Sequence, residues 1–509
     1  EEFGQTLGSE GVHIIDPFTG TGTFITRLLQ SGLISPEQLP HKYKHEIHAN
    51  EIVLLAYYIA AINIEAVYHA LLGGKYEPFQ GICLTDTFQL YEKGDMISDL
   101  LTNNSDRRKR QKALDIRVIV GNPPYSVGQE SDNDNNQNVK YESLDSRVKE
   151  TYVARSTGNP RSLYDSYIRA FRWASDRIGP SGIVGFVTNA GVMDSIAGDG
   201  FRACLEEEFS NIYVFHLRGN QRTSGERSRQ EGGKIFGSGS RAPIAISLLI
   251  KNPQSENRGK ISWHDIGDYL TQQQKLDLIR GFGSVRGISN SCGWTPIIPD
   301  EYHDWINQRD QSFEKFIRVG DKKDRSSRVI FESYSSGVKT CRDFWCYNFS
   351  RAGLADRMKE MIEFYNSQLL NYKNTRKKST DSPDGYLSND ETKISWSHVL
   401  KIQLGRLKEG VFQNAALIHA GYRPFTKTWM YYDNHFNENR YLMARIFPTG
   451  NELNRIFTLG SGGAGPESPP IMLDAPFSLQ PNHGTQCFPL YLYDKPDSSA
   501  PDDLFSSAP

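Results

Sequence analysis

The stretch "VHIIDPFTGTGTF", residues 12–24, joins an apolar strand to a turn and the start of a helix. Gly20 and Gly22 allow the backbone to turn tightly and approach a ligand, and the helix that follows offers unpaired N–H groups in its first turn. A dinucleotide-binding fingerprint would have a third glycine where Ile25 stands. The stretch predicts a ligand-binding turn of a nucleotide-binding sheet, and a plain strand-to-helix turn is the alternative.

Apolar strand-like runs alternate with helical patterns from this stretch to about residue 250, as a parallel sheet with crossover helices requires. The expected strands are residues 12–16, 45–51, 81–87, 117–121, 182–189, 211–219 and 242–251. Only a basic, glycine-rich loop separates the last two, so we expect a hairpin at the sheet edge with one strand antiparallel. The predicted fold class is α/β, with a Rossmann-like sheet of the S-adenosylmethionine-dependent methyltransferase type that has seven strands, the last reversed.

Acidic residues close the next two strands of this sheet. Glu51 ends the second strand, where a carboxylate suits hydrogen bonds from ribose hydroxyls. Asp86 follows the third and can accept from the exocyclic amine of an adenine. Each acid alone is more often a helix cap or part of a solvated turn. The glycine loop, the two acids and then an Asn-Pro-Pro-Tyr sequence close successive strands, and this joint order predicts S-adenosylmethionine as the cofactor.

The sequence "GNPPY", residues 121–125, leaves the fourth strand as a stiff loop. Adjacent prolines cannot continue a helix or donate sheet hydrogen bonds. Asn122 and Tyr125 are therefore expected in fixed positions beyond the C-terminal end of the strand. Ligands bind at that end of open α/β sheets.

Asn-Pro-Pro-Tyr suits chemistry on an adenine amino group, whose nitrogen is a poor nucleophile because its lone pair is delocalised into the ring. The side-chain oxygen of Asn122 and the backbone carbonyl of Pro123 can accept its hydrogens, with Pro124 keeping the loop rigid. These acceptors also stabilise the positive charge that develops as a methyl group arrives. Tyr125 offers a flat face for a base extruded from the duplex. A structural turn capped by tyrosine is the alternative.

Length and composition limit the class of protein. At 509 residues the chain predicts two or three domains. None of the six cysteines forms a CxxC pair, so neither a zinc site nor a disulfide framework is expected, and a reducing cytoplasm is the simplest compartment. We expect no membrane partner, because no apolar run reads as long enough to span a bilayer. The net charge of −2 leaves nucleic acid open, since a binding cleft needs only a local basic surface.

Two segments near the expected site are candidates for contact with DNA. The loop 218–241 has two acidic residues against six basic ones, for which we predict phosphate contacts near the flipped base: Arg218, Arg222, Arg227, Arg229, Lys234 and Arg241. A solvated loop is the alternative. The segment 126–162 is rich in Ser, Asn, Asp and Gln, and either folds over DNA or is a mobile insertion.

The regular alternation of strand and helix ends near residue 290. Aromatic residues mix there with basic and amide residues, which are the types that hold phosphates and read base edges. We single out no base-reading side chain. The aromatic residues Trp396, Tyr422, Phe425 and Trp429 are each expected to lie mostly in the core.

The motifs together resemble those of the γ-class DNA adenine-N6 methyltransferases: "DPFTGTGTF", "NE" at 50–51, "TDTF" at 85–88 and "GNPPYSVGQ". The resemblance implies that Asp16, Phe18, Gly20 and Gly22 hold the cofactor. It implies further that Glu51 binds the ribose and Asp86 the adenine of the cofactor, with Asn122 also at the cofactor. Asn122, Pro123, Pro124 and Tyr125 are then catalytic on a flipped base.

Other segments look like the C-terminal half of type ISP restriction–modification enzymes: "HANEIVLLAYYIAAINIE" (48–65), "DWINQRD" (304–310), "YRPFTKTWMYYD" (422–433) and "CFPLYLYD" (487–494). The resemblance implies a methyltransferase domain at 1–290, a mixed α+β target recognition domain at 291–509, and double-stranded DNA as partner. In this family a cofactor-site segment called motif X precedes motif I, so we expect the methyltransferase domain to be truncated before motif I. The upstream nuclease, ATPase and coupler regions of such a polypeptide are absent from this chain.

Two other functions compete with adenine methylation of DNA. Asn-Pro-Pro-Tyr loops also serve methyltransferases that act on protein glutamine or on RNA, although a large aromatic and basic second domain argues against the compact glutamine-directed enzymes. The chain could also be a DNA-recognition module with an inactive methyltransferase site. The intact set of Asp16, Glu51, Asp86 and Asn122 argues against that decay.

Overall fold

The computed structural model describes residues 2–91, 102–124, 140–237, 241–310, 312, 315–322, 324, 326–376, 382–460, 470–479 and 484–493. Two compact units divide the chain, Glu1–Asp310 and Gln311–Pro509. The predicted boundary at 290/291 falls inside the first unit, because β9 (Thr295–Ile297) pairs with β8 (Lys260–Asp265) in its sheet. Which function each unit performs remains a prediction.

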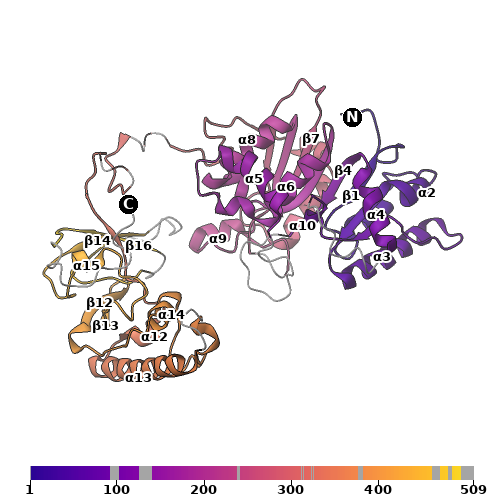
Figure 1. Cartoon of the computed structure of the whole chain (residues 1–509). Helices are drawn as coiled ribbons and strands as arrows, with labels where there is room; N and C mark the ends of the chain where they lie inside the picture. The colour runs from indigo at the N-terminus through magenta and orange to yellow at the C-terminus, as the bar shows by residue number, and fades with distance from the viewer. Residues whose placement is uncertain are drawn as a thin grey trace. The chain divides into compact units, whose positions relative to one another are not determined.

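A sheet forms the centre of the first unit (Figure 1). It has nine strands, in the order β3-β2-β1-β4-β5-β7-β6-β8-β9. The first seven strands are β1 (His13–Asp16), β2 (Ile47–Glu51), β3 (Ile82–Leu84), β4 (Ile116–Gly121), β5 (Gly182–Asn189), β6 (Asn211–His216) and β7 (Ile244–Lys251). All seven were expected from the sequence. β7 runs antiparallel to both of its neighbours, β5 and β6, so the predicted fold class with its reversed seventh strand is confirmed.

The expected hairpin of β6 and β7 is present, but it does not lie at the sheet edge. β6 also pairs in parallel with β8, and β9 forms the edge beyond it. A short helix, α9 (Gly225–Glu231), lies in the loop that was expected to lack one. β8, "KISWHD", was missed because a short strand on a half-covered part of a sheet has only a weak hydrophobic pattern.

Helices cover both faces of the central strands. Consecutive residues of a strand point to opposite faces, so Ile14 and Ile15 of β1 belong to different core clusters. Ile14 packs with α1 (Thr23–Gln30) and α3 (Leu54–Leu72), and Ile15 lies in the cluster that includes α6 (Ser166–Arg177) and α8 (Asp199–Glu208). The remaining helices of this unit are α2 (Leu39–His41), α4 (Thr102–Ala113), α5 (Glu142–Val148), α7 (Gly191–Asp194), α10 (Gln272–Phe282) and α11 (Val285–Ser291).

Helix α3 corrects one expectation. By length and composition it could cross a membrane, although the sequence was expected to hold no such run. Its buried residues Ala60, Ile64 and Tyr68 pack in the core cluster beside the sheet. Other apolar residues of α3 are exposed, Leu55 by 70% and Ile62 by 63%.

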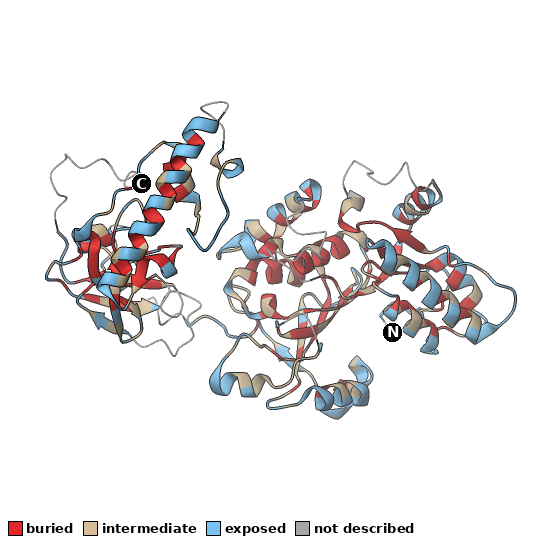
Figure 2. Cartoon of the chain, turned by 90° about the horizontal axis from the view of Figure 1, so that it is seen from below, coloured by how far each residue is buried: buried red, intermediate tan, exposed pale blue. Residues whose placement is uncertain are grey.

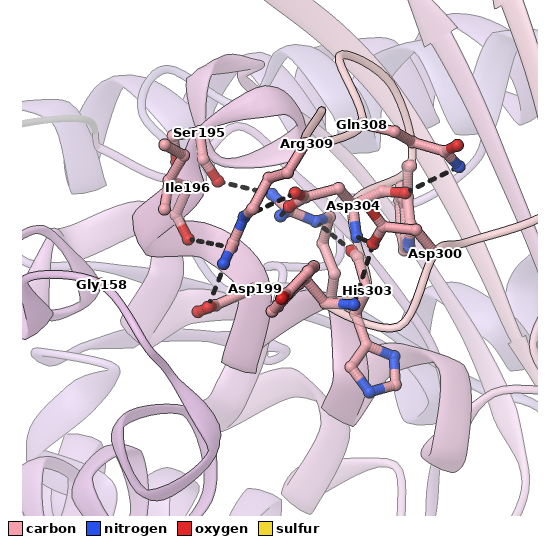
Figure 3. Close-up of polar contacts among 12 residues, drawn as sticks. Gly158, Ser195, Ile196, Asp199, Asp300, His303, Asp304, Gln308 and Arg309 are labelled. Carbon is pink, nitrogen blue, oxygen red and sulfur yellow. Dashed lines mark hydrogen bonds and ion pairs between the residues drawn. The ribbon is translucent and has the colours of Figure 1, made fainter. Parts of the chain in front are cut away.

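A buried network of ion pairs fastens residues 300–309 to the sheet unit (Figure 3). The guanidinium of Arg202, on α8, pairs with Asp304 and donates to the carbonyl oxygens of Val192 and Ser195 at 2.9 and 2.8 Å. Arg309 pairs with Asp304 at 2.8 Å and with Asp199 at 3.2 Å. A buried charge is tolerated only when it is paired in this way. The network places the chain up to Asp310 in the first unit.

The second unit combines two small sheets with one long helix. The four-stranded sheet has the order β10-β16-β14-β15 and the three-stranded sheet has the order β11-β13-β12. Their strands are β10 (Ser335–Ser336), β11 (Tyr347–Asn348), β12 (Leu417–Arg423), β13 (Thr426–Tyr431), β14 (Ile456–Gly460), β15 (Ile471–Leu473) and β16 (Thr485–Pro489). In Figure 2 the long helix α13 (Arg351–Thr375) carries its buried residues along one side. The other helices are α12 (Asp343–Cys346), α14 (His398–Gly405) and α15 (Met443–Ile446).

Candidate cofactor site and nucleic-acid surface

Four neighbouring strands bring the predicted site residues to one edge of the sheet. β2 lies between β3 and β1, and β4 follows β1 on the other side, all in parallel. Asp16 ends β1, Glu51 ends β2, Asp86 follows β3, and Gly121 ends β4 directly before Asn122. The carboxyl ends of parallel strands meet at a common edge, so the four predicted motifs are neighbours in space.

The glycine loop after β1 is held in shape by Glu51. Gly20 has a φ of 56° and donates its N–H to Glu51 Oε2 at 2.8 Å. Glu51 Oε1 accepts from the N–H of Val53 at 2.7 Å. Gly22 has a φ of 90°, and a Cβ added to it would lie 3.3 Å from the Cα of Ala60 on α3. A side chain at Gly22 would thus meet both backbone strain and a neighbouring helix.

Asp16 is a buried carboxylate beneath the same loop. Its Oδ1 accepts from the N–H of Phe18 at 3.0 Å, whereas its Oδ2 has no hydrogen-bond partner within the described residues. Burial, together with a smaller effect of the nearby Glu51 carboxylate, raises the pKa of Asp16 to about 7. A buried carboxyl with an unused oxygen and a raised pKa is characteristic of functional sites.

The loops of the first three strands are linked by residues that the sequence analysis did not single out. Thr87 donates its hydroxyl to the carbonyl of Pro17 at 2.6 Å, and Asn50 donates its amide to Thr87 at 3.3 Å. The carbonyl of Asn50 accepts from Thr19 at 3.0 Å. Asn50 and Thr87 each stand beside a predicted acid in the sequence, and this position was the only signal for them.

Tyr141 is a further residue that sequence reasoning missed. Its hydroxyl donates to Asp86 Oδ2 at 2.8 Å, while the Oδ1 of Asp86 accepts from Phe88 at 2.9 Å. Burial raises the pKa of Asp86, and burial beside that carboxylate raises the pKa of Tyr141. The guanidinium of Arg169 lies 5.4 Å from the centre of the Tyr141 ring. Part of the segment 126–162 is therefore packed against the site.

The Asn-Pro-Pro loop starts beside the first motif. A Cβ added to Gly121 would lie 3.0 Å from Asp16 Oδ1, so a side chain there would push against the Asp16 carboxyl. Asn122 is half-buried, and Pro123 is buried. The ring of Phe18 packs 5.5 Å from that of Phe88. Tyr125 and residues 126–139 lie outside the described residues.

The six basic residues of the loop 218–241 lie in different surroundings. Arg218 pairs with Asp265 at 2.6 Å and with Asp268, so its charge is already compensated. Arg229 lies 3.4 Å from Glu226, and Arg241 donates to the carbonyl of Gln221 at 2.9 Å. Of the other three, Arg222 and Arg227 are exposed and Lys234 is half-buried.

This loop follows the carboxyl end of β6, which points the same way as β5 because both are antiparallel to β7. It therefore leaves the sheet at the edge where the predicted site residues lie. Across the described part of the chain, no group of three or more His, Cys, Asp or Glu side chains is arranged to hold a metal ion.

Comparison with known proteins places the second unit in a family. Residues 329–507 match the family model "Type ISP C-terminal specificity domain". The match lies within the second unit, Gln311–Pro509. The comparison with curated proteins returned no match.

Solved Type ISP structures are similar to nearly the whole chain. A nuclease-deletion mutant of the Type ISP restriction–modification enzyme LlaGI, in complex with a DNA substrate mimic, is 42% identical, with a TM-score of 0.85 over 96% of this chain and 40% of that one. The ATP-dependent Type ISP enzyme LlaBIII, bound to DNA, is 38% identical, with a TM-score of 0.84 over 98% of this chain and 33% of that one. DrdV, in a complex with DNA, is 35% identical, with a TM-score of 0.83 over 97% of this chain and 47% of that one.

The chain thus spans less than half the length of each of these Type ISP relatives and of DrdV. The resemblance to type ISP enzymes that the sequence predicted is confirmed. It holds for both units, because the matched regions cover almost all of the chain.

Proposed function

We propose that this chain is the modification and recognition part of a cytoplasmic Type ISP restriction–modification enzyme. In this proposal it transfers a methyl group from S-adenosylmethionine to the N6 nitrogen of an adenine in a specific sequence of double-stranded DNA. Nuclease, ATPase and coupler regions of the same polypeptide would lie outside this chain, which spans less than half of each relative.

The observation that carries the proposal is the meeting of four motifs at one edge of the sheet. The backbone of Gly20 is bonded to Glu51, and the ideal Cβ position of Gly121 lies 3.0 Å from Asp16 Oδ1. Asn122 therefore follows directly on a glycine at which a side chain would meet the buried acid of the glycine loop. A plain structural turn would not require a buried carboxyl with an unused oxygen at this place.

The residues present fit S-adenosylmethionine. Its amino group and ribose hydroxyls are hydrogen-bond donors, and Asp16 and Glu51 offer carboxylate oxygens on neighbouring strand ends. Asp86 would accept from the adenine amine on the lone pairs that Phe88 and Tyr141 leave available. Phe18, Gly20 and Gly22 would form the wall of the site. When bound, the cofactor supplies an electrophilic methyl group.

The chain's own residues would prepare the nucleophile. The side-chain oxygen of Asn122 and the carbonyl of Pro123 would accept hydrogen bonds from the two N–H groups of the adenine amine. These hydrogen bonds would draw the lone pair of the amine out of the ring. Both oxygens would also stabilise the positive charge as the methyl group is transferred. The stiffness of Pro123 and Pro124 would hold these acceptors in place. Stacking of the base on Tyr125 remains a prediction.

DNA is the proposed substrate because the second unit carries a specificity domain and the similar enzymes LlaGI and LlaBIII have been solved with DNA. The target amine lies inside the base stack, so the adenine must be flipped out before it can react. The exposed Arg222 and Arg227 are proposed phosphate contacts beside the flipped base. We propose phosphate contacts for four further residues of this loop: Arg218, Arg229, Lys234 and Arg241. Their charges are less available than those of Arg222 and Arg227, because three of them have bonded partners and Lys234 is half-buried.

The test uses methyl-labelled S-adenosylmethionine and unmethylated genomic DNA, with the product digested to nucleosides and identified by mass spectrometry. We expect labelled N6-methyladenosine, and we expect Asn122→Ala to lower its rate by at least about 10³-fold because the amine acceptor is lost. Asn103→Ala, at an exposed asparagine of α4, is the matched control and should leave the rate unchanged.

Undiminished turnover of Asn122→Ala would overturn the catalytic assignment. If the wild-type chain leaves DNA unlabelled, the same assay with a longer polypeptide that includes the regions found in the relatives separates two cases. Label in the longer polypeptide alone would show that the chain needs those regions. No label in either would favour a recognition module or another substrate.

A further inference from the structure

The tip of the β12–β13 hairpin presents one aromatic ring to solvent. Arg423 pairs with Thr426, so Pro424 and Phe425 form a two-residue turn. Phe425 is 82% exposed, whereas the aromatic residues Tyr422 and Trp429 of the same hairpin are partly buried against the core. The expectation that Phe425 lies in the core is therefore wrong, and the exposed ring requires another explanation.

The backbone at this tip is strained. Phe425 has a φ of 60°, in the left-handed region that bulky side chains rarely adopt. A turn with positive φ at this position favours glycine or asparagine. A phenylalanine here carries both the cost of the backbone conformation and the cost of an exposed apolar ring. Strain of this kind persists at functional sites, because the side chain is needed where the turn puts it.

The stem below the tip is firmly held. β12 and β13 pair in register from Leu417 to Gly421 before a bulge leads into the turn. Gly421 donates its N–H to the carbonyl of Pro476 at 2.8 Å and accepts from Ser478 at 2.9 Å. A Cβ added to Gly421 would collide with the ring of Phe477, so the glycine allows this close contact. β12 is thus held along one edge by β13 and along the other by residues 476–478.

Positive charge flanks the exposed ring. Arg423 and Lys427 are both exposed. The guanidinium of Arg423 lies 4.1 Å from the centre of the Tyr422 ring. Lys427 forms an ion pair with Asp474, and because both side chains are exposed, a phosphate can displace this weak pair. An apolar ring between cations suits a polyanion whose bases stack on aromatic faces. A protein surface that buried this tip would have to desolvate both charges.

We propose that Phe425 is an aromatic wedge that stacks on, or inserts between, base pairs of the DNA bound by the specificity domain. The proposal rests on the proposed function and names a residue of its recognition surface. Apolar side chains on rigid elements unstack base steps in this way, and the neighbouring cations hold the phosphates on either side. The rigid stem supplies the ring without any ordering of the loop on binding.

The test compares variants of the full chain on DNA. Wild-type protein first selects from a pool of randomised 40-base-pair duplexes, and the enriched duplex becomes the probe. Phe425→Gly relieves the backbone strain, so its melting temperature should equal or exceed that of the wild type, while its affinity for the probe falls about 10- to 100-fold. Phe425→Tyr keeps a ring and should stay within about threefold of the wild type.

Phe349→Ala is the matched control, because Phe349 is another ring of this unit that is 77% exposed. Its affinity should be unchanged. With 2-aminopurine placed at successive positions of the probe, fluorescence should rise at one step with the wild type and not with Phe425→Gly, as unstacking requires.

The outcomes separate the wedge from the proposed function. A wild type that enriches a sequence while Phe425→Gly binds it equally well overturns the wedge alone, and that result would fit a tip that docks on protein. A wild type that enriches no sequence overturns the recognition function and the wedge with it.

Discussion

The carboxyl edge of the nine-stranded sheet and the tip of the β12–β13 hairpin differ in how they hold their candidate functional side chains. At the sheet edge the functional groups are buried: Asp16 is fully buried, and Glu51 and Asp86 are 9% and 7% exposed. Asp16 and Asp86 each accept from a backbone N–H of their own loop, and Glu51 accepts from the N–H of Gly20 in the neighbouring loop. At the hairpin tip the functional candidate Phe425 is 82% exposed, and only the stem beneath it is fixed.

The difference shows how one chain can separate chemistry from recognition. Acceptors for a cofactor must be held in a dry, fixed arrangement, so their substitution should change stability and function together. A recognition group must reach out from a rigid support, so its loss should reduce function alone. The predictions below test this contrast, beginning with the largest expected effect.

Glu51→Ala should reduce both stability and cofactor affinity, and by the largest amounts. The carboxylate of Glu51 accepts from two backbone N–H groups, one of them in the glycine loop. Hydrogen bonds to a charged group contribute about 1.5–3 kcal/mol each, so unfolding of the first unit should become easier by about 3 kcal/mol. Affinity for S-adenosylmethionine, measured by calorimetry, should fall at least about tenfold.

The matched control for this change is Glu37→Ala, at an exposed glutamate that accepts from the hydroxyl of Ser35. It should change neither stability nor cofactor affinity. Unchanged cofactor affinity in Glu51→Ala itself would remove the ribose role from that residue.

Asp16→Asn should have an effect that depends on pH. The pKa of Asp16 is about 7 in the folded chain and near 3.8 when unfolded, so between these values the folded state binds the extra proton. The stability contributed by Asp16 is therefore complete below pH 3.8 and is lost as pH rises through 7. Asparagine does not titrate and so removes this loss. The free energy of unfolding of the variant, relative to that of the wild type, should therefore increase by ~2–3 kcal/mol as the pH rises from 5 to 8.

Urea unfolding at the two pH values measures this gain. The wild type measured beside the variant supplies the reference at each pH. An equal difference in stability at pH 5 and pH 8 would show that Asp16 is ionised in the folded chain throughout this range.

Lys427→Ala should have the smallest effect on stability, because its ion pair with Asp474 is exposed and contributes at most about 1 kcal/mol. Removing one phosphate contact should weaken DNA binding almost equally for all sequences and reduce the slope of the salt dependence by about 1. Lys401→Ala, which removes the surface ion pair with Asp384, is the control. A loss of sequence preference in Lys427→Ala would give this residue a base-reading role.

Much of the first sheet could be predicted because its signals are local. Each of the first seven strands is a continuous or alternating apolar run, and the absence of a long crossover between β6 and β7 indicated the reversed strand. β8 and β9 and the network around Arg309 depend on contacts far apart in the sequence, such as that between Arg202 and Asp304. No local pattern indicates such contacts, so the end of the first unit was placed too early.

Some residues of the candidate site could likewise be predicted from the sequence, and others could not. Asp16, Glu51 and Asp86 stand at strand ends, and topology alone brings them to one edge. Tyr141 could not be foreseen, because its contact with Asp86 depends on how a long polar segment returns to the sheet. Phe425 was misjudged because aromatic residues are usually buried, and sequence does not reveal the positive φ that turns its ring outward.

The bond between Gly20 and Glu51 has a consequence for protein engineering. The glycine loop keeps its shape through Glu51 and Asn50, which belong to the next strand, and through Thr87 beyond it. A graft of residues 16–24 into another sheet would therefore carry the letters of the motif without its conformation. The smallest portable unit is the block from β1 through Thr87, with three strands and the helices between them.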